Sequence, residues 1–318
     1  MIDGIPKISV LVITYEQKNI VSRTLDSLIA QRDYLHEICV SDDCSFDGTW
    51  EVLLDYQNRF PDLIKLHRQE PNVGIFKNTE YSWTMPTGDI INEIAGDDTT
   101  PDGWYKAVAE FVLKNNIDWK NESFCIYGDY KAEYPNGDSF IFSNRKVIQR
   151  GEMFRKKWRG LLSGRGSCYS RQILKRLQNV SQGRSHIVER AQDMQVVYWA
   201  EKSYYISRLS NVYYTGIGIS TRLSDEMLEE RIKIPKYAKD YYERLGHSFS
   251  KTDIHYLEYE MMSIRYQNDK TIKVFLKMLL LYLQSLDLSL PGMGFNMRRY
   301  LFAFLRRIPH KNPICMHI

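Results

Sequence analysis

The chain has 318 residues, of which 43% are hydrophobic and 26% are charged. This composition is typical of a folded globular protein and excludes a disordered chain. The net charge is only +4, and the basic residues gather near one end: residues 271–318 contain seven Lys or Arg and a single acid, Asp287. A nucleic-acid-binding protein spreads basic residues over a domain face, so we expect no nucleic-acid partner.

The cysteines predict a reducing environment. They are odd in number and lack the paired spacing of a zinc site: Cys39, Cys44, Cys125, Cys168 and Cys315. Residues 1–7 show no signal-peptide pattern. The most apolar stretch, residues 274–283, is much shorter than the ~20 residues that span a bilayer. We therefore expect a cytoplasmic protein, with peripheral attachment to the inner face of the membrane as a further option.

The first part of the chain alternates between short apolar strands and amphipathic helices. We predict three strands with a helix in each interval between them: residues 8–14, 37–41 and 64–67. Strands that alternate with helices form a parallel, right-handed doubly wound sheet. Such sheets bind ligands at the carboxyl ends of their strands, where the loops that begin at Thr14, Asp42 and Arg68 are expected to meet.

The elements that follow extend this pattern. A helix is predicted near residues 78–85, and a strand over residues 89–95 ends at Gly96-Asp97-Asp98. Pro101 is predicted to open the next helix, since proline suits a first turn. Further along we predict a hairpin and two helical regions: strands at 124–134 and 139–143 around Asn136-Gly137, and helices over 185–202 and 224–285. The predicted fold is α/β, a doubly wound, mostly parallel sheet flanked by helices, with a helical C-terminal extension.

Adjacent acids at the end of a strand have two interpretations. Asp97 and Asp98 could belong to an ordinary turn that caps the next helix. However, Gly96 allows a close backbone approach, and the apolar strand before it places both acids at the rim of the sheet. Carboxylate oxygens suit Mg²⁺ or Mn²⁺ when phosphate and water complete the coordination. We therefore favour a metal site here.

Five short motifs occur in order within residues 8–111. They are Val-Ile-Thr-Tyr-Glu (12–16), Ser-Asp-Asp-Cys-Ser-Phe-Asp-Gly-Thr (41–49), Asn72-Val-Gly74 with Asn78, Thr-Gly-Asp-Ile (87–90) and Gly-Asp-Asp (96–98). Each motif alone is common, whereas five in order are specific. Together they resemble the nucleotide-binding half of the inverting family-two glycosyltransferases, which have the GT-A fold. The resemblance implies a metal-dependent enzyme that transfers a sugar from a nucleotide diphosphate donor.

The resemblance assigns roles to residues on the donor side. Thr14, Tyr15 and Glu16 match the loop that touches the nucleotide, with Tyr15 against the base; an ordinary turn is the alternative. Asp43 matches the acid that accepts a hydrogen bond from the base, usually uracil. For Asp42 or Asp43 the alternative is a capping carboxylate.

Three further residues complete the expected donor site. Lys77 either faces the nucleotide or is an ordinary exposed lysine. Asp97 is expected to hold the ribose or the donor sugar, and Asp98 to bind Mn²⁺ or Mg²⁺, with a UDP-sugar as the donor substrate. The cation would stabilise the negative charge on the departing diphosphate.

An inverting transfer also needs a base that takes the proton of the acceptor hydroxyl. In the resembling family this base is an Asp that opens a later helix, and Asp193 matches it. Here Gln192 replaces the Glu or Gly that precedes the family's base, so Glu189, one turn earlier on the same face, is the rival. A solvated helix acid is the third option. Residues 163–174 resemble the family's small-residue loop and Arg-bearing strand, which supports this register.

We expect two regions: a catalytic domain at residues 1–222, with a nucleotide-binding half (1–115) and an acceptor-binding half (116–222), and a helical C-terminal region at residues 223–318. Residues 213–222 depart from the later Tyr-Arg, His and Ser pattern of the resembling family, which implies that Ser220 or Arg222 could close over the diphosphate.

The basic tail has an amphipathic pattern. On a helical wheel Leu301, Phe304, Leu305 and Ile308 lie together, opposite Arg299 and Arg306. Residues 290–318 therefore fit a helix on a membrane surface. The alternative is packing against the protein's own domain or against a second copy in a homodimer.

The expected activity is transfer of a hexose from a UDP-sugar to a hydroxyl of a glycan acceptor. We expect the acceptor to be lipid-diphosphate-linked and the pathway to be O-antigen or capsule synthesis. One alternative is a sugar-phosphate nucleotidyltransferase, although residues 14–19 lack the glycines of its first loop. The other alternative is a non-catalytic scaffold protein that binds nucleotide sugars.

Overall fold

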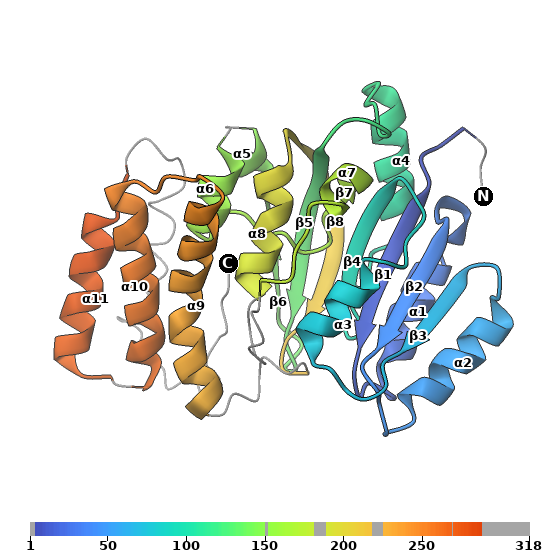
Figure 1. Ribbon diagram of the computed structural model, residues 1–318, viewed down its shortest axis with the longest axis horizontal. Helices are drawn as coiled ribbons and strands as arrows, with labels where there is room; N and C mark the ends of the chain where they lie inside the picture. Colours follow the sequence, from blue (N-terminus) through green and yellow to red (C-terminus); the bar gives the residue numbers. More distant parts are fainter. Residues whose placement is uncertain (1–3, 150–151, 181–188, 218–224, 269, 288–318) are drawn as a thin grey trace.

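The computed structural model describes residues 4–149, 152–180, 189–217, 225–268 and 270–287. Over these residues the chain forms a mixed sheet covered by helices on both faces, followed by a layer of helices at one end (Figure 1). The strand order is β3-β2-β1-β4-β7-β5-β6, with β8 paired to β5. The strands are β1 (Ile8–Thr14), β2 (Glu37–Asp42), β3 (Ile64–Arg68), β4 (Ile90–Ala95), β5 (Phe124–Glu133), β6 (Ser139–Phe142), β7 (Cys168–Ser170) and β8 (Lys202–Tyr214).

The helices divide between the two faces of the sheet and the C-terminal layer. They are α1 (Val21–Ile29), a 3₁₀ turn η1 (Arg32–Tyr34), α2 (Thr49–Arg59), α3 (Ile75–Ser82), α4 (Trp104–Lys114), α5 (Arg145–Ile148), α6 (Met153–Trp158), α7 (Arg171–Leu174), α8 (Glu189–Trp199), α9 (Asp225–Arg244), α10 (Lys251–Asn268) and α11 (Ile272–Gln284). None of these helices is both long and apolar enough to cross a membrane.

The side chains of β1 alternate between two cores. Val10 and Val12 belong to an apolar cluster shared with α1, α2 and α4, whereas Leu11 belongs to a cluster shared with α7 and α8. All three side chains are fully buried, as expected for a central strand with helices on both faces. Burial of each stabilises the fold by roughly 1.5–3 kcal/mol. The loop that leaves the carboxyl end of β1 therefore starts from a firmly held strand.

Most of the predicted architecture is confirmed. β2 lies parallel to β1 and β3, and β4 lies parallel to β1 on its other side. β5 and β6 form the predicted hairpin, in which Gly137 has a φ of 86°. The prediction that Pro101 opens a helix is wrong, since α4 begins at Trp104. Gly103, the residue before α4, has a left-handed backbone conformation with a φ of 74°, so the helix cannot extend back through it to Pro101.

The largest difference from the prediction is β8. The sequence pattern predicts no strand over residues 202–214, and the predicted helix over residues 185–202 runs too far, since α8 ends at Trp199. β8 pairs in parallel with β5. A Cβ atom on Gly128 would lie only 2.6 Å from the carbonyl oxygen of Arg208, so the close approach of these two strands requires glycine at this position.

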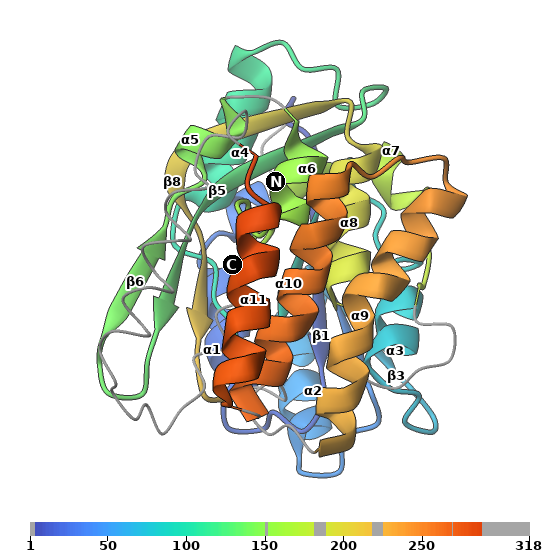
Figure 2. The same cartoon turned by 90° about the vertical axis from the view of Figure 1, so that its left-hand side faces the viewer.

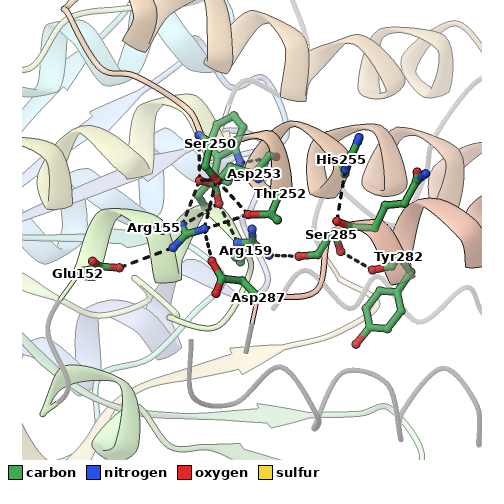
Figure 3. A network of polar contacts seen from close by, with 12 residues as sticks. Glu152, Arg155, Arg159, Ser250, Thr252, Asp253, His255, Tyr282, Ser285 and Asp287 are labelled. Atoms are coloured by element: carbon green, nitrogen blue, oxygen red, sulfur yellow. Dashed lines mark hydrogen bonds and ion pairs between the residues drawn. The ribbon is translucent and has the colours of Figure 1, made fainter. Parts of the chain in front are cut away.

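The three C-terminal helices lie side by side (Figure 2). Tyr242, Tyr256 and Tyr282 share one apolar cluster with Trp158 of α6 and Met194 of α8. A buried ion cluster reinforces this packing (Figure 3). Asp253 of α10 accepts hydrogen bonds from the Nε atoms of Arg155 and Arg159, at 2.9 and 2.8 Å. Burial raises the pKa of Asp253, but hydrogen bonds from Ser250 and Arg155 and the charge of Arg159 lower it below its usual value.

Glu37 ties the amino-terminal ends of three strands together. Its carboxylate accepts hydrogen bonds from Ser9 Oγ, at 2.7 Å, from Thr87 N and Oγ1, and from Lys65 Nζ. Burial raises the pKa of Glu37, but these hydrogen bonds outweigh it and lower the pKa from 4.5 to about 2.

The Glu37→Gln variant is expected to lose about 2 to 3 kcal/mol of unfolding free energy at neutral pH. Because the folded pKa lies below the unfolded one, the stabilisation is complete above pH 4.5 and disappears as the pH falls towards 2. Urea unfolding of both proteins at several pH values checks this expectation. A difference in unfolding free energy between wild type and Glu37→Gln that stays constant down to pH 3 would contradict it.

Candidate functional site

The carboxyl ends of β1, β2 and β4 meet at one edge of the sheet. Thr14 lies opposite Asp42 in the β1–β2 register, and the amide of Gly96 donates to the carbonyl of Ile13 at 2.9 Å. The loops after β1 and β2 are also joined directly. Glu16 N donates to Ser45 Oγ at 2.9 Å, and Gln17 N donates to Thr49 Oγ1 at 2.8 Å. The expected meeting of these loops is therefore confirmed.

Gly96 lies in close contact with the first loop. A Cβ atom on Gly96 would lie 2.2 Å from Gln17 Oε1 and 3.1 Å from Thr14 Cβ. The first distance is too short for a real Cβ atom and the second is tighter than most, so a larger residue at position 96 would first displace the flexible Gln17 side chain. The close approach inferred from the sequence is present.

Helix α1 holds the backbone of the Asp97-Asp98 turn. Thr24 Oγ1 lies 2.8 Å from the carbonyl oxygen of Gly96 and 2.7 Å from that of Asp98. Arg23 Nη2 donates to the carbonyl of Asp97 at 2.8 Å, and its guanidinium lies 3.4 Å from the ring centroid of Tyr214. The turn is thus fixed before any ligand binds.

The carboxylate of Asp98 is buried at this edge, with only 3% of the residue exposed. Its Oδ2 lies 3.6 Å from Arg165 Nη1 and 3.5 Å from Asn211 Nδ2. Burial raises the pKa of Asp98 to about 7, and the charge of Asp97 adds to this, whereas Arg165 opposes it. Burial thus disfavours the negative form of Asp98, although hydrogen bonds from Asn211 and the amide of Tyr214 also oppose the shift.

Several polar atoms around Asp98 are buried without a hydrogen-bond partner among the described residues. They are Thr14 Oγ1, Gln17 Oε1, Arg23 Nε, Asp98 Oδ1 and Asn211 Oδ1. Buried polar groups in folded proteins are nearly always paired, so a cluster of exceptions indicates a place built for a polar ligand. Donors and acceptors are both represented in this cluster.

One atom of this cluster is a suitable ligand for a divalent cation. Asp98 Oδ1 is a buried carboxylate oxygen free to ligate. The described residues contain no group of three His, Cys, Asp or Glu side chains that could hold a metal by themselves. A cation at Asp98 would therefore take most of its ligands from a bound diphosphate and from water, as Mg²⁺ commonly does.

The two acids after β2 have different surroundings. Asp42 receives hydrogen bonds from Ser45 N and Oγ, at 2.9 and 2.5 Å, and is the turn-capping carboxylate. Asp43 Oδ1 accepts a hydrogen bond from Val73 N at 2.8 Å. Burial raises the pKa of Asp43, although the amides of Val73 and Gly74 oppose the change. Asp43 thus fixes the loop before α3.

The other residues that the sequence predicts for the donor side belong to the loops and the helix at the same edge. Tyr15 is half-buried beside Asp43, and burial and the charge of Glu16 raise its pKa. Glu16 is exposed in the same loop, and Lys77 is exposed on α3. Asp97 is buried, which raises its pKa, while its own amide, Arg165 and Arg23 oppose the shift.

Asp193 and its rival Glu189 both lie on α8, but their side chains fall outside the described residues. The next residue, Met194, is fully buried and belongs to the same apolar cluster as Phe76 of α3. Helix α3 begins directly after Gly74, at the carboxyl edge of the sheet. Ser220, Arg222 and residues 290–318 lie outside the described residues.

Arg165 was missed by the sequence reasoning. It lies in a loop that Asn144 holds: Asn144 Nδ2 donates to the carbonyl of Ser163 at 3.1 Å, and Asn144 Oδ1 accepts from Ser163 N. A Cβ atom on Gly166, which has a φ of 65°, would lie 2.6 Å from the carbonyl of Ser210. The signal in the sequence was the small-residue run around Arg165, noted there only for register.

Three residues of β8 were also missed. Tyr213 lies under Arg165, with 3.8 Å between the guanidinium and the ring centroid. Asn211 contacts Asp98, and Tyr214 contacts Arg23. No local pattern marks these residues, because their place depends on the unpredicted strand.

The model of the family described as Glycosyl transferase family 2 matches residues 9–178, more than half of the chain. The chain belongs to this family. The match covers the first loop, the Asp42-Asp43 turn, Gly96-Asp97-Asp98 and the Arg165 loop. The chain thus has the GT-A-like fold of this family, and the edge described above is its candidate donor site.

Sequence relatives match only part of this chain. The uncharacterized protein Mb1547 of Mycobacterium bovis is 29% identical over 91 residues, which are 28% of this chain and 26% of that protein. EpsE of Bacillus subtilis is 29% identical over 93 residues, 29% of this chain and 34% of EpsE. The matched segment thus spans about a quarter to a third of these relatives.

Solved structures match more of this chain. S. aureus TarS 1–349 has a TM-score of 0.58 at 17% identity, covering 88% of this chain and 78% of that chain. The same protein in complex with UDP-GlcNAc gives 0.56 at 17% identity, with 87% and 79% covered. Mannosyltransferase PcManGT from Pyrobaculum calidifontis, in complex with GDP-Man and Mn²⁺, gives 0.53 at 14% identity, with 94% and 81% covered. At these identities the likeness shows the fold alone.

Proposed function

We propose that this glycosyltransferase is an inverting, metal-dependent enzyme that transfers a hexose from a UDP-sugar to a hydroxyl of a glycan. The observation that carries the proposal is Asp98 Oδ1, a buried carboxylate oxygen without a partner among the described residues, at the edge where the loops after β1 and β2 meet. Two solved structures with this fold hold UDP-GlcNAc, or GDP-Man and Mn²⁺. They support a nucleotide-sugar donor and a divalent cation here.

On the donor side, the residues around the Thr14 loop would bind the nucleotide. Tyr15 would lie against the base, Asp43 would accept a hydrogen bond from it, and Lys77 would approach the phosphates. Asp97 would hold the ribose or the sugar. Asp98 would ligate Mn²⁺ or Mg²⁺, which supplies positive charge for the departing diphosphate.

Arg165 is proposed to stabilise the negative charge of the departing diphosphate together with the cation. Its guanidinium lies 3.6 Å from Asp98 and stacks on Tyr213, so it is already directed at the place where diphosphate charge develops. Fixed cations aimed at such a place stabilise a transition state without reorganisation.

Arg165→Ala is expected to lower kcat/KM for the donor by about tenfold to a hundredfold, because a charge-assisted contact to diphosphate is lost. Steady-state release of nucleotide diphosphate measures the effect, with Arg145→Ala, an exposed arginine on α5, as the matched control. Tighter donor binding in Arg165→Ala would show instead that Arg165 competes with the ligand for Asp98.

On the acceptor side, Asp193 of α8 is proposed to take the proton of the attacking hydroxyl, with Glu189 as the rival. A base that acts during attack on the anomeric carbon needs hydrogen-bond reach to that hydroxyl. The buried neighbour Met194, in one cluster with Phe76 of α3, supports a place for α8 near the donor edge. Ser220 or Arg222 would close over the diphosphate.

The finer biological role is also a proposal. We place the acceptor among glycans, lipid-diphosphate-linked, in O-antigen or capsule synthesis, with residues 1–115 binding the donor, 116–222 the acceptor, and residues 223–318 forming a helical region. Cys39, Cys44, Cys125 and Cys168 are free and buried, in keeping with a cytoplasmic enzyme. The tail at residues 290–318 would attach it to the inner membrane face or to a second copy in a homodimer.

Incubation with Mn²⁺ and a panel of nucleotide sugars, with and without lipid-diphosphate-linked sugar acceptors, tests the proposal. Release of UDP that depends on both Mn²⁺ and an acceptor is the expected result. Sugar-phosphate-dependent release of pyrophosphate from a nucleoside triphosphate would favour a nucleotidyltransferase. Binding of a nucleotide sugar without turnover under any condition would favour the scaffold alternative.

A further inference from the structure

Helix α11 carries an exposed apolar strip. It lies at the outer edge of the C-terminal helices (Figure 1) and faces the viewer in Figure 2. Five large apolar side chains are exposed on it: Ile272 (69%), Leu276 (56%), Leu279 (41%), Leu280 (55%) and Leu283 (48%). At 3.6 residues per turn these five positions fall within a sector of about 100° on the helix. They form one continuous surface, here called the α11 strip.

The α11 strip is not the face that holds the helix in the fold. Met278, Leu281 and Tyr282 are buried on the other side of α11. Tyr282 packs against Tyr259 of α10 with 5.1 Å between ring centroids, and Phe275 packs against Tyr266 at 5.7 Å. One face of α11 therefore packs against the rest of the protein, and a second apolar face is exposed to solvent.

The carboxyl end of α11 is firmly attached to the catalytic part of the molecule (Figure 3). Arg159 Nη1 donates to the carbonyl of Ser285 at 2.6 Å, and Arg155 Nη2 donates to Asp287 Oδ2 at 2.5 Å. Both arginines also hold Asp253 of α10. The α11 strip is thus presented at a fixed orientation.

The positive charge of α11 indicates which kind of surface the α11 strip can bind. Lys273 and Lys277 are exposed beside the strip, and residues 272–284 contain no acid. A second copy packed strip to strip in parallel would bring the lysines of both copies together, and in either direction its α11 would offer them no acid. Residues 288–318 carry five Lys or Arg and no acid, so docking of the chain's own tail would also oppose like charges. An apolar surface edged with negative charge fits best.

We propose that the α11 strip binds the surface of a bilayer that contains anionic phospholipid. The leucines enter the boundary between headgroups and acyl chains, and Lys273 and Lys277 reach the lipid phosphates along their apolar stems. This inference rests on α11 alone and does not depend on the transfer chemistry. It also differs from attachment through residues 290–318.

Co-sedimentation of the full-length protein with phosphatidylglycerol–phosphatidylcholine vesicles tests the inference. Leu276→Gln/Leu280→Gln is expected to weaken binding by about tenfold or more, because apolar area no longer leaves water. Lys273→Gln/Lys277→Gln is expected to weaken binding by about tenfold on these vesicles, with little change on pure phosphatidylcholine. Ile141→Gln on β6, where 56% of the isoleucine is exposed, is the matched control and should bind like wild type.

All four substituted leucine and lysine positions are exposed, so the variants should keep the wild-type Tm. Wild-type vesicle binding by Leu276→Gln/Leu280→Gln would overturn the inference and leave the tail as the site. A lipid-free dimer that becomes monomeric in this variant would assign the strip to a second copy. A Leu280→Cys thiol that resists maleimide in the lipid-free monomer would show that the chain itself covers the strip.

Discussion

Asp98→Asn is expected to abolish measurable sugar transfer, with a loss of about a thousandfold in kcat/KM, and to remove the effect of Mn²⁺ on donor binding. The substitution keeps the size of the side chain and removes its charge. Burial raises the pKa of Asp98 to about 7, so a bound cation would both supply the missing charge and keep the carboxylate ionised. Asparagine cannot provide this pairing.

The measurements for Asp98→Asn are acceptor-dependent UDP release and calorimetric titration of UDP with and without Mn²⁺. Asp102→Asn is the matched control, because Asp102 is an exposed carboxylate on the same segment. Metal-dependent transfer at the wild-type rate by Asp98→Asn would remove Asp98 from the metal site. Asp97 would then be the next candidate, as the buried neighbour near Arg165.

Asp193→Asn is expected to leave UDP binding unchanged and to reduce transfer by about a hundredfold to ten-thousandfold. The reason is that a base acts on the acceptor hydroxyl during attack and contributes nothing to holding the nucleotide. The expected signature is thus a loss in kcat with an unaltered donor dissociation constant, measured by UDP release and by calorimetry on the same protein.

Glu189→Gln and Asp55→Asn complete the Asp193 experiment. Asp55 is an exposed helix acid on α2 and serves as the control. If Asp193→Asn transfers at the wild-type rate while Glu189→Gln does not, the base is one turn earlier on α8. Full activity in both variants would place the base elsewhere in the chain.

The arrangement of residues 8–98 could be predicted because its signals in the sequence are local. The alternation of Val10, Leu11 and Val12 between two cores follows from one buried strand, and parallel strands bring their carboxyl ends to a common edge. Thr14, Asp43 and Gly96 could therefore be placed together without any coordinates. The close approach of the first loop to residue 96 also follows from that edge.

The positions of β8 and Arg165 beside Asp98 could not be predicted, because they depend on packing between segments far apart in the sequence. β8 carries tyrosines of intermediate burial and exposed polar residues, so its pattern is weaker than that of β1. Arg165 reaches Asp98 from a loop that hydrogen bonds from Asn144 and from the Ser210 hydroxyl hold in place. The sequence therefore does not predict that Arg165 is the counter-ion of Asp98, although the small-residue loop around Arg165 resembles a loop of the family.

Calorimetric titration of UDP into the wild-type protein, with and without Mn²⁺, tests the central claim most directly. The account predicts that Mn²⁺ strengthens UDP binding by about tenfold or more, since diphosphate oxygens and Asp98 would share the cation. The same strengthening should be absent from Asp98→Asn. Equal UDP affinity with and without Mn²⁺ in the wild-type protein would contradict a metal-dependent donor site at Asp98.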